Sequence, residues 1–258
     1  MPRIHPTAVV EPGAKIADDA EIGAGATIGP EVELAPGVEI RPHAHVWGRT
    51  TIGSGTRIFP FAVVGEEPQD KSFSGESTEL LVGRDNVIRE HTAIHVGTRK
   101  GGGSTRIGDD NLIMNGVHVG HDTTIGSHCI IASHCAIGGH ALLEDYAVVG
   151  GLSGIHQFAR VGESSMVAAL SGVTKDAPPF SLVAGERATL RGLNVVGLKR
   201  RGFSTESRRA IRRAYQLLFS SKLRLEPALE QVREECLPSP EVERLVAFLE
   251  NSERGFSR

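Results

Sequence analysis

The chain is rich in histidine, and one histidine is followed directly by a carboxylate. Eleven histidines occur among the 258 residues, and the pair His121–Asp122 places an imidazole next to an acid. A neutral imidazole that donates one ring N–H to a carboxylate is a general base near pH 7. If the backbone turns the Asp122 carboxylate back toward the ring, the pair predicts base catalysis on a substrate hydroxyl, with no serine or cysteine nucleophile.

A six-residue repeat decides where these side chains lie. Large aliphatic residues recur every six positions, and a small or β-branched residue usually stands four positions after each one. The first series is Ile4, Val10, Ile16, Ile22, Ile28, Leu34, Ile40, Val46, Ile52, Ile58 and Val64; the pattern resumes at Val82, Ile88 and Ile94, and again from Ile107 to Val173. Neither a helical period nor simple alternation gives this spacing. It predicts an all-β parallel β-helix, a triangular prism whose coils each take three steps.

The repeat also predicts which groups share an edge of the prism. No histidine occupies either inward position, so all eleven are expected to face outward. Residues 18 apart should stack, with rungs about 5 Å apart. One edge then gathers His118, His121, Asp122, Gly139, His140, His156 and Gln157. Gly139 lets a substrate approach the backbone closely, and its N–H could stabilise an oxyanion.

A second edge is mostly small and apolar. It carries Ser133, Gly151 and Ala169, followed by His134, Leu152 and Leu170. A groove for a hydrocarbon chain would have this character. Cys129 and Cys135 fall at inward positions, which predicts buried, unreactive thiols.

Two stretches leave the repeat, and a helical segment follows it. Residues 66–80 and 97–105 are predicted to be loops thrown out from a prism that spans 1–190. Helical patterns then fill 191–258 and are expected to cap the prism. One helical face has Ile211, Ala214, Tyr215 and Leu218, after Ser204 as N-cap; another has Val242, Leu245, Val246 and Leu249.

Basic residues concentrate near the start of this segment. They are Lys199, Arg200, Arg201, Arg208, Arg209, Arg212 and Arg213, with Glu206 as the one acid between them. Such a patch suits phosphates or an acidic carrier protein. A solvated helix face explains it equally well.

Composition excludes several classes of protein. The net charge of −3 argues against a nucleic-acid binder. The sequence has neither an apolar signal core at its N-terminus nor a run of about 18 apolar residues to span a membrane. Three cysteines make no disulfide framework or metal motif. We therefore expect a cytoplasmic protein.

Several motifs closely resemble the family of UDP-N-acetylglucosamine O-acyltransferases that begin lipid A biosynthesis (LpxA). The resemblance covers nearly the whole chain. It includes the stretches 118–122, 139–140, 154–158, 192–194, 197–203 and 254–258. The hexapeptide repeat is shared by many acyltransferases, whereas these motifs are far more specific.

The resemblance implies a left-handed β-helix, a homotrimer with active sites between subunits, and no metal or other cofactor. The family moves an acyl chain from acyl carrier protein to the glucosamine 3-hydroxyl of UDP-N-acetylglucosamine. By position, His121 would be the general base, Asp122 its orienting partner and Gly139 the oxyanion donor. The implied substrate contacts are Asp70, His118, His140, His156, Gln157, Asn194, Arg200 and Arg201, and the implied acyl groove is Met166, Ala169 and Leu170.

The sequence departs from the family at a few positions. Ser72 stands where the family has a lysine, with Lys71 one residue earlier, while Glu79 replaces a common basic residue and Val196 an occasional acid. Several acyl chain lengths are compatible with the sequence, and so is an acceptor sugar with either a 3-hydroxyl or a 3-amino group.

Three other interpretations use the same prism. The first is a coenzyme A-dependent acetyltransferase. The second is a zinc hydratase with His118, His121 and His140 as ligands. The third is a scaffold without catalytic activity.

Overall fold

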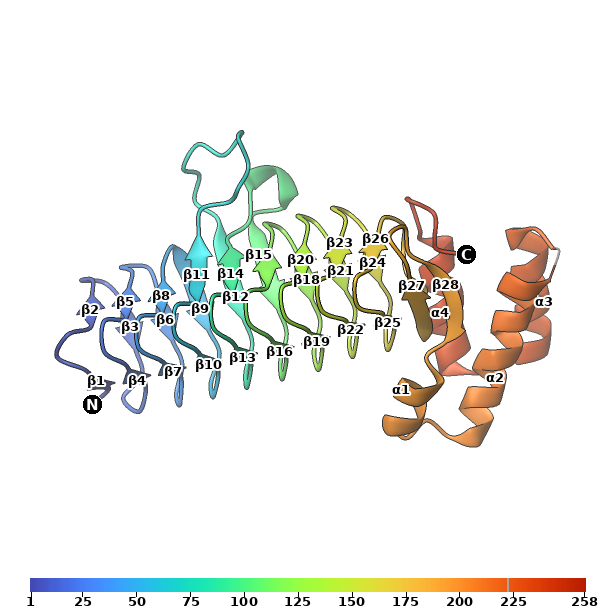
Figure 1. The fold of residues 1–258 in the computed structure, drawn as a ribbon, viewed down its shortest axis with the longest axis horizontal. Coiled ribbons are helices and arrows are strands. Elements are labelled where there is room, and N and C mark those ends of the chain that lie inside the picture. Colours follow the sequence, from blue (N-terminus) through green and yellow to red (C-terminus); the bar gives the residue numbers. More distant parts are fainter. Residues whose placement is uncertain (222) are drawn as a thin grey trace.

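The computed structural model describes residues 1–221 and 223–258 and confirms the predicted fold class: a parallel β-helix followed by helices (Figure 1). Most strands are two residues long, and each pairs in parallel with the third strand along the chain. The pairing Leu112↔Ile130 and Ile113↔Ile131 shows the predicted 18-residue coil. Three flat sheets result, which we call sheets A, B and C.

Sheet A forms one face of the prism and ends in an antiparallel pair. Its strands are β1 (Arg3–Ile4), β4 (Glu21–Ile22), β7 (Glu39–Ile40), β10 (Arg57–Ile58), β13 (Val87–Ile88), β16 (Leu112–Ile113), β19 (Ile130–Ile131), β22 (Val148–Val149), β25 (Met166–Val167), β27 (Ser181–Ala184) and β28 (Thr189–Leu193). The last two strands, β27 and β28, pair in antiparallel.

Sheets B and C form the other two faces. Sheet B contains β2 (Val9–Val10), β5 (Thr27–Ile28), β8 (His45–Val46), β11 (Val63–Glu66), β14 (Ala93–His95), β17 (His118–Val119), β20 (Ala136–Ile137), β23 (Gly154–Ile155) and β26 (Gly172–Val173). Sheet C contains β3 (Lys15–Ile16), β6 (Glu33–Leu34), β9 (Arg49–Ile52), β12 (Glu79–Val82), β15 (Ser104–Ile107), β18 (Thr124–Ile125), β21 (Leu142–Leu143) and β24 (Arg160–Val161).

The core of the prism is a column of the two inward positions. Ile28, Ile58 and Ile131 are fully buried at the first position, and Ala26 and Ala62 at the second. Small residues alternate with large ones because three faces must meet within a narrow triangle. The first coil differs from the prediction, since Ile4 is 42% exposed. It lies in β1, at the end of sheet A, where a neighbouring strand covers only one side.

Two loops interrupt the prism on the same side (Figure 1). The first connects β11 to β12, and the second connects β14 to β15 and contains the short helix η1 (Arg99–Gly101). Both start from sheet B and return to sheet C, so they hang over the edge between these sheets. That edge is the one on which the sequence gathers histidines.

The C-terminal helices form a second hydrophobic cluster at the end of the prism. They are α1 (Val195–Arg200), α2 (Thr205–Tyr215), η2 (Gln216–Ser220), α3 (Leu225–Cys236) and α4 (Pro240–Glu250). Both predicted helical faces are buried in this cluster. The Ser204 hydroxyl accepts from Ser207 N at 2.9 Å and so caps α2 as predicted. Among the described residues, no helix has the length and apolar character needed to cross a membrane.

Candidate active site

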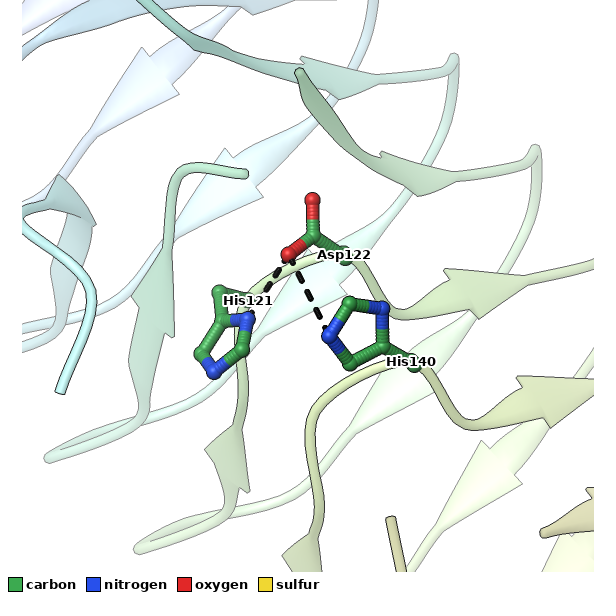
Figure 2. A group of neighbouring side chains, drawn as sticks. All are labelled: His121, Asp122 and His140. Atoms are coloured by element: carbon green, nitrogen blue, oxygen red, sulfur yellow. Dashed lines mark hydrogen bonds and ion pairs between the residues drawn. The ribbon is translucent and has the colours of Figure 1, made fainter. Parts of the chain in front are cut away.

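A turn of the coil between β17 and β18 turns the His121 ring toward the neighbouring carboxylate. Asp122 sits in the left-handed region, at φ +59°. This bend directs its side chain back, so that His121 Nδ1 lies 2.7 Å from Asp122 Oδ2 (Figure 2). The Asp122 side chain is fully buried, while that of His121 keeps 18% of its surface exposed. The pair therefore has a hidden acid and a ring that substrates can reach.

One rung along, His140 completes the cluster. His140 Nε2 lies 3.7 Å from the same Asp122 oxygen, and its ring meets that of His121 edge to face (Figure 2). His140 in turn stacks on Phe158, with ring centroids 4.5 Å apart. Positions 122, 140 and 158 therefore stack as the repeat predicts.

The backbone at Gly139 lies against the free edge of the His121 ring. A Cβ on Gly139 would stand 2.9 Å from His121 Cε1 and 3.0 Å from Nε2, so only glycine leaves this edge open. Within residues 1–221 and 223–258, no hydrogen bond uses the Gly139 N–H. A donor next to the base is thus available to a ligand.

The second loop holds the buried carboxylate. Thr98 donates to both Asp122 oxygens, from its N–H at 2.8 Å and from its hydroxyl at 2.7 Å. The Asp122 N–H donates to the hydroxyl of Thr105, also at 2.8 Å. The sequence analysis did not single out either threonine. The only signal was the break in the repeat between Ile94 and Ile107.

His118 lies on the same face of the prism as His95, a histidine that is buried from solvent. His95 points out of the prism as expected, but it is only 6% exposed, whereas an outward residue should be solvated. The first loop covers it, and its Nδ1 donates to the Glu67 carbonyl at 2.7 Å. Its ring centroid is 5.1 Å from that of His118. Burial, followed by the fields of His95 and His121, lowers the pKa of His118, which favours the neutral ring.

Asp70 comes from the first loop. Hydrogen bonds from Ser72 N at 2.9 Å and Ser72 Oγ at 3.0 Å lower the pKa of Asp70, and His121 and Lys100 add smaller contributions. Ser72, which departs from the family pattern, therefore stabilises the ionised form of this carboxylate.

The remaining predicted residues of the histidine edge lie further along the prism. His156 and Gln157 are both exposed, and His156 Nδ1 lies 2.9 Å from the Gln157 carbonyl. Arg254 reaches the same nitrogen, at 3.3 Å, from the C-terminal end of the chain.

Comparisons with known proteins place the chain. The profile of the UDP-N-acetylglucosamine O-acyltransferase family, domain 2, matches residues 176–257, and the hexapeptide transferase profile matches residues 104–139. The acyl-[acyl-carrier-protein]–UDP-N-acetylglucosamine O-acyltransferase of Anaeromyxobacter sp. is 53% identical over 255 residues, which is 99% of each chain. That of Myxococcus xanthus is 48% identical over the full length of both.

The chain belongs to the UDP-N-acetylglucosamine O-acyltransferase family.

Solved structures agree with this assignment. LpxA from Acinetobacter baumannii superposes with a TM-score of 0.96 at 41% identity, and the superposition covers 99% of each chain. The Arabidopsis enzyme superposes with a TM-score of 0.88 at 34% identity, covering 99% of this chain and 100% of the Arabidopsis chain. A mirror-image winding could not superpose in this way, which confirms the left-handed β-helix. The protein is an acyltransferase.

In this acyltransferase, the predicted substrate contacts Asn194, Arg200 and Arg201 lie on a different edge from His121. The Asn194 side chain caps α1 by accepting from Gly197 N at 3.0 Å, and it donates to Ser164 O at 2.9 Å. Arg201 pairs with Glu163 at 3.0 Å and stacks on Tyr146, 3.4 Å from the ring centroid. Both therefore join α1 to the edge between sheets C and A. Arg200 is exposed beside them.

The predicted acyl-groove residues lie elsewhere again. Ala169 is exposed, and Leu170 keeps 68% of its surface exposed, on the edge between sheets A and B. Met166 projects from β25, on the outer face of sheet A. Sheet B separates this apolar edge from the histidine edge. Within one chain of this acyltransferase, the structure thus brings together the catalytic candidates but not the complete set of substrate contacts.

The cluster has donor atoms that could also hold a metal. One ligand atom each from His121, Asp122 and His140 lies within 4.8 Å of the others. The zinc hydratase interpretation used His118 in place of Asp122. The Nδ1 of His121 bonds to the carboxylate, as in an oriented general base, and zinc-bound histidines make the same contact through the nitrogen that does not bind the metal. Membership of an acyltransferase family agrees with the general base.

Proposed function

We propose that the protein transfers an acyl group from an acyl carrier protein thioester to the 3-hydroxyl of UDP-N-acetylglucosamine, with His121 as general base. The supporting observation is the 2.7 Å contact between His121 Nδ1 and Asp122 Oδ2, together with the open backbone of Gly139 at the other side of the ring. The names of the relatives supply both substrates.

The geometry supports a direct transfer in which charge is balanced at each step. Because Nδ1–H donates to Asp122, the lone pair on Nε2 is free to take the proton of the sugar hydroxyl. The hydroxyl oxygen attacks the thioester carbonyl, and the Gly139 N–H stabilises the resulting oxyanion. The carbon–sulfur bond then breaks, and protonated His121 returns its proton to the thiolate. No metal or other cofactor enters the proposed reaction.

A hollow between α1 and α2 also favours an acyl carrier protein as donor. Lys199, Arg209 and Arg212 line a hollow of about 220 Å³ whose floor includes Leu193 and Leu198. A cationic rim around an apolar floor suits an acidic protein that presents an acyl chain. The rim is smaller than the sequence suggested, because acids from distant segments pair with two of the seven basic residues: Arg201 with Glu163 and Arg213 with Glu235.

We also propose a homotrimer in the cytoplasm, where acyl carrier proteins and UDP-sugars are available. Sheet A presents an outward row of apolar residues, Val87, Leu112, Ile130, Val148 and Met166. Such a row on a prism face favours contact with another copy of the chain. Contact between copies would let the histidine edge of one subunit meet the apolar edge or the α1 region of the next.

The first experiment is acyl transfer by the purified protein. UDP-N-acetylglucosamine and its 3-amino analogue are offered with a ladder of acyl carrier protein thioesters, with and without a 3-hydroxyl, and with acetyl-coenzyme A. We expect one chain length to dominate, and His121→Ala to fold normally but to lose about 10²–10⁴ in rate. No transfer from any carrier thioester, or equal rates for His121→Ala and the native protein, would overturn the proposal.

A further inference from the structure

Thr98, in the second loop, donates hydrogen bonds to both oxygens of the buried acid. Its N–H donates to Asp122 Oδ1 at 2.8 Å, and its hydroxyl to Oδ2 at 2.7 Å. Thr98 is 3% exposed, and the Asp122 side chain is fully buried. Water does not compete for these bonds, so their geometry is fixed by the protein.

The direction of the Thr98 hydroxyl proton is also fixed. The same oxygen accepts from Gly101 N at 3.2 Å, as N-cap of η1. With its lone pair directed to that N–H, the hydroxyl proton is left for Asp122. Gly101 itself lies so close that a Cβ there would overlap the Asp122 carboxyl group. The η1 turn therefore packs directly against the carboxylate.

These bonds bear directly on the base. The Oδ2 atom that accepts from Thr98 is the one that lies 2.7 Å from His121 Nδ1. With both oxygens held, the carboxyl group cannot rotate away from the ring. A carboxylate held in this position accepts the N–H of the ring, which places the ring proton on Nδ1. The lone pair then stays on Nε2, where the proposed reaction requires it.

We propose that Thr98 is a positioning residue that holds Asp122 in place and so fixes the orientation and tautomer of His121. This inference rests on the proposed function, because it concerns the same base. Thr98 itself has no contact with the reacting atoms, so it acts only through Asp122.

The test compares Thr98→Val, which has nearly the same shape but no hydroxyl, with Thr98→Ser, which keeps the donor. Steady-state transfer from acyl carrier protein to UDP-N-acetylglucosamine is measured from about pH 5 to 9. We expect Thr98→Val to lower kcat by about 10-fold to 100-fold, which is the range for the loss of a hydrogen bond to a charged group. KM for the sugar nucleotide should change by less than about 2-fold. Thr98→Ser should retain most of the rate.

The pH profile separates positioning from general damage. Without the hydroxyl, the oxygen facing His121 carries more charge and stabilises the protonated ring. The acid limb of kcat/KM should therefore move to higher pH in Thr98→Val and stay in place in Thr98→Ser. The other titratable groups near His121 are His140, His118 and Asp70, which all three proteins share.

Thr56→Val is the matched control. Thr56 is also buried, and its hydroxyl donates to Gly83 O at 2.9 Å and accepts from Asn86 N at 3.2 Å, far from the base in the sheet order. It should leave kcat and the pH profile unchanged. Suppose that the native enzyme is active and His121→Ala is inactive. If Thr98→Val then has the native rate and pH profile, the inference about Thr98 is overturned while the proposed function stands. Equal losses in Thr98→Val and Thr98→Ser would also overturn it, by showing a role in loop folding. An inactive native enzyme would instead overturn the proposed function.

Discussion

His118 lies half-buried in β17, beside the buried ring of His95 and close to His121. The first loop covers the neighbouring His95, whose Nδ1 donates to the Glu67 carbonyl. An outward position in the repeat therefore does not guarantee a solvated side chain. For a basic group, loss of water disfavours the protonated form, so His118 is held neutral beside the proposed base.

This burial predicts a dependence of stability on pH. Since the folded-state pKa of His118 is lowered, the unfolded chain binds a proton more readily as pH falls through about 6.5. The free energy of unfolding should therefore decrease from about pH 7 toward pH 5. We expect His118→Gln to reduce this decrease, measured as urea midpoints across that range.

The control is His134→Gln, which changes an exposed histidine on another edge. His134→Gln should leave the change of the urea midpoint with pH the same as in the native protein. An unchanged slope in His118→Gln would show that other groups cause the acid-side loss.

At the scale of elements, departures from the repeat carry much of the site. The two loops bring Asp70 and Thr98 to the histidine edge, while α1 and α2 supply the basic rim of the hollow. The prism alone offers a rigid row of rungs. Segments that leave its register add the contacts that a flat face cannot make.

The basic rim leads to a prediction for the donor. Arg209→Glu should raise KM for the acyl carrier protein thioester about 10-fold at low salt, because the basic rim attracts the acidic carrier protein. KM for the sugar nucleotide should stay nearly unchanged. Steady-state kinetics at about 20 mM and 300 mM salt would measure this, and the difference should shrink at the higher salt. Arg106→Glu, on β15 of the prism, is the control for the change in charge; an equal effect there would contradict a local docking site.

At the scale of the whole molecule, three edges of the prism carry three different groups of predicted site residues. The histidines, the apolar groove residues and the α1 contacts are separated by whole sheets, so a single prism cannot bring all of them to one substrate. The apolar row on sheet A offers the contact through which neighbouring copies would do so.

This arrangement predicts that assembly and activity are lost together. Ile130 is 39% exposed in the middle of the row, and Ile130→Arg should place an unpaired charge in the interface. Light scattering after size-exclusion chromatography should show a mass of three chains for the native protein and one chain for the variant, with little acyl transfer. Leu81→Arg makes the same kind of change on the outer face of sheet C and should leave the mass unchanged. A native mass for Ile130→Arg would place the interface elsewhere.

The sequence by itself determined what depends on local, periodic rules. A step of six residues decides which side chains face inward at every coil, so the β-helix, the buried positions from Ile22 onward and the stacking of Asp122, His140 and Phe158 could all be predicted. The helical faces in the C-terminal segment follow equally from periodicity. The resemblance to the family also rested on local motifs, and the comparisons confirmed it.

Only the tertiary structure decided what depends on segments without a period. Thr98 reaches Asp122 across 24 residues through a turn whose path no repeat specifies. The loop that buries His95, and the acids that pair with Arg201 and Arg213, are likewise distant in sequence. Such contacts depend on where the chain returns in space, and hydrogen bonds and ion pairs act over a few ångströms. A one-dimensional pattern therefore identified the candidate base and its acid, while the fold identified the residues that hold them.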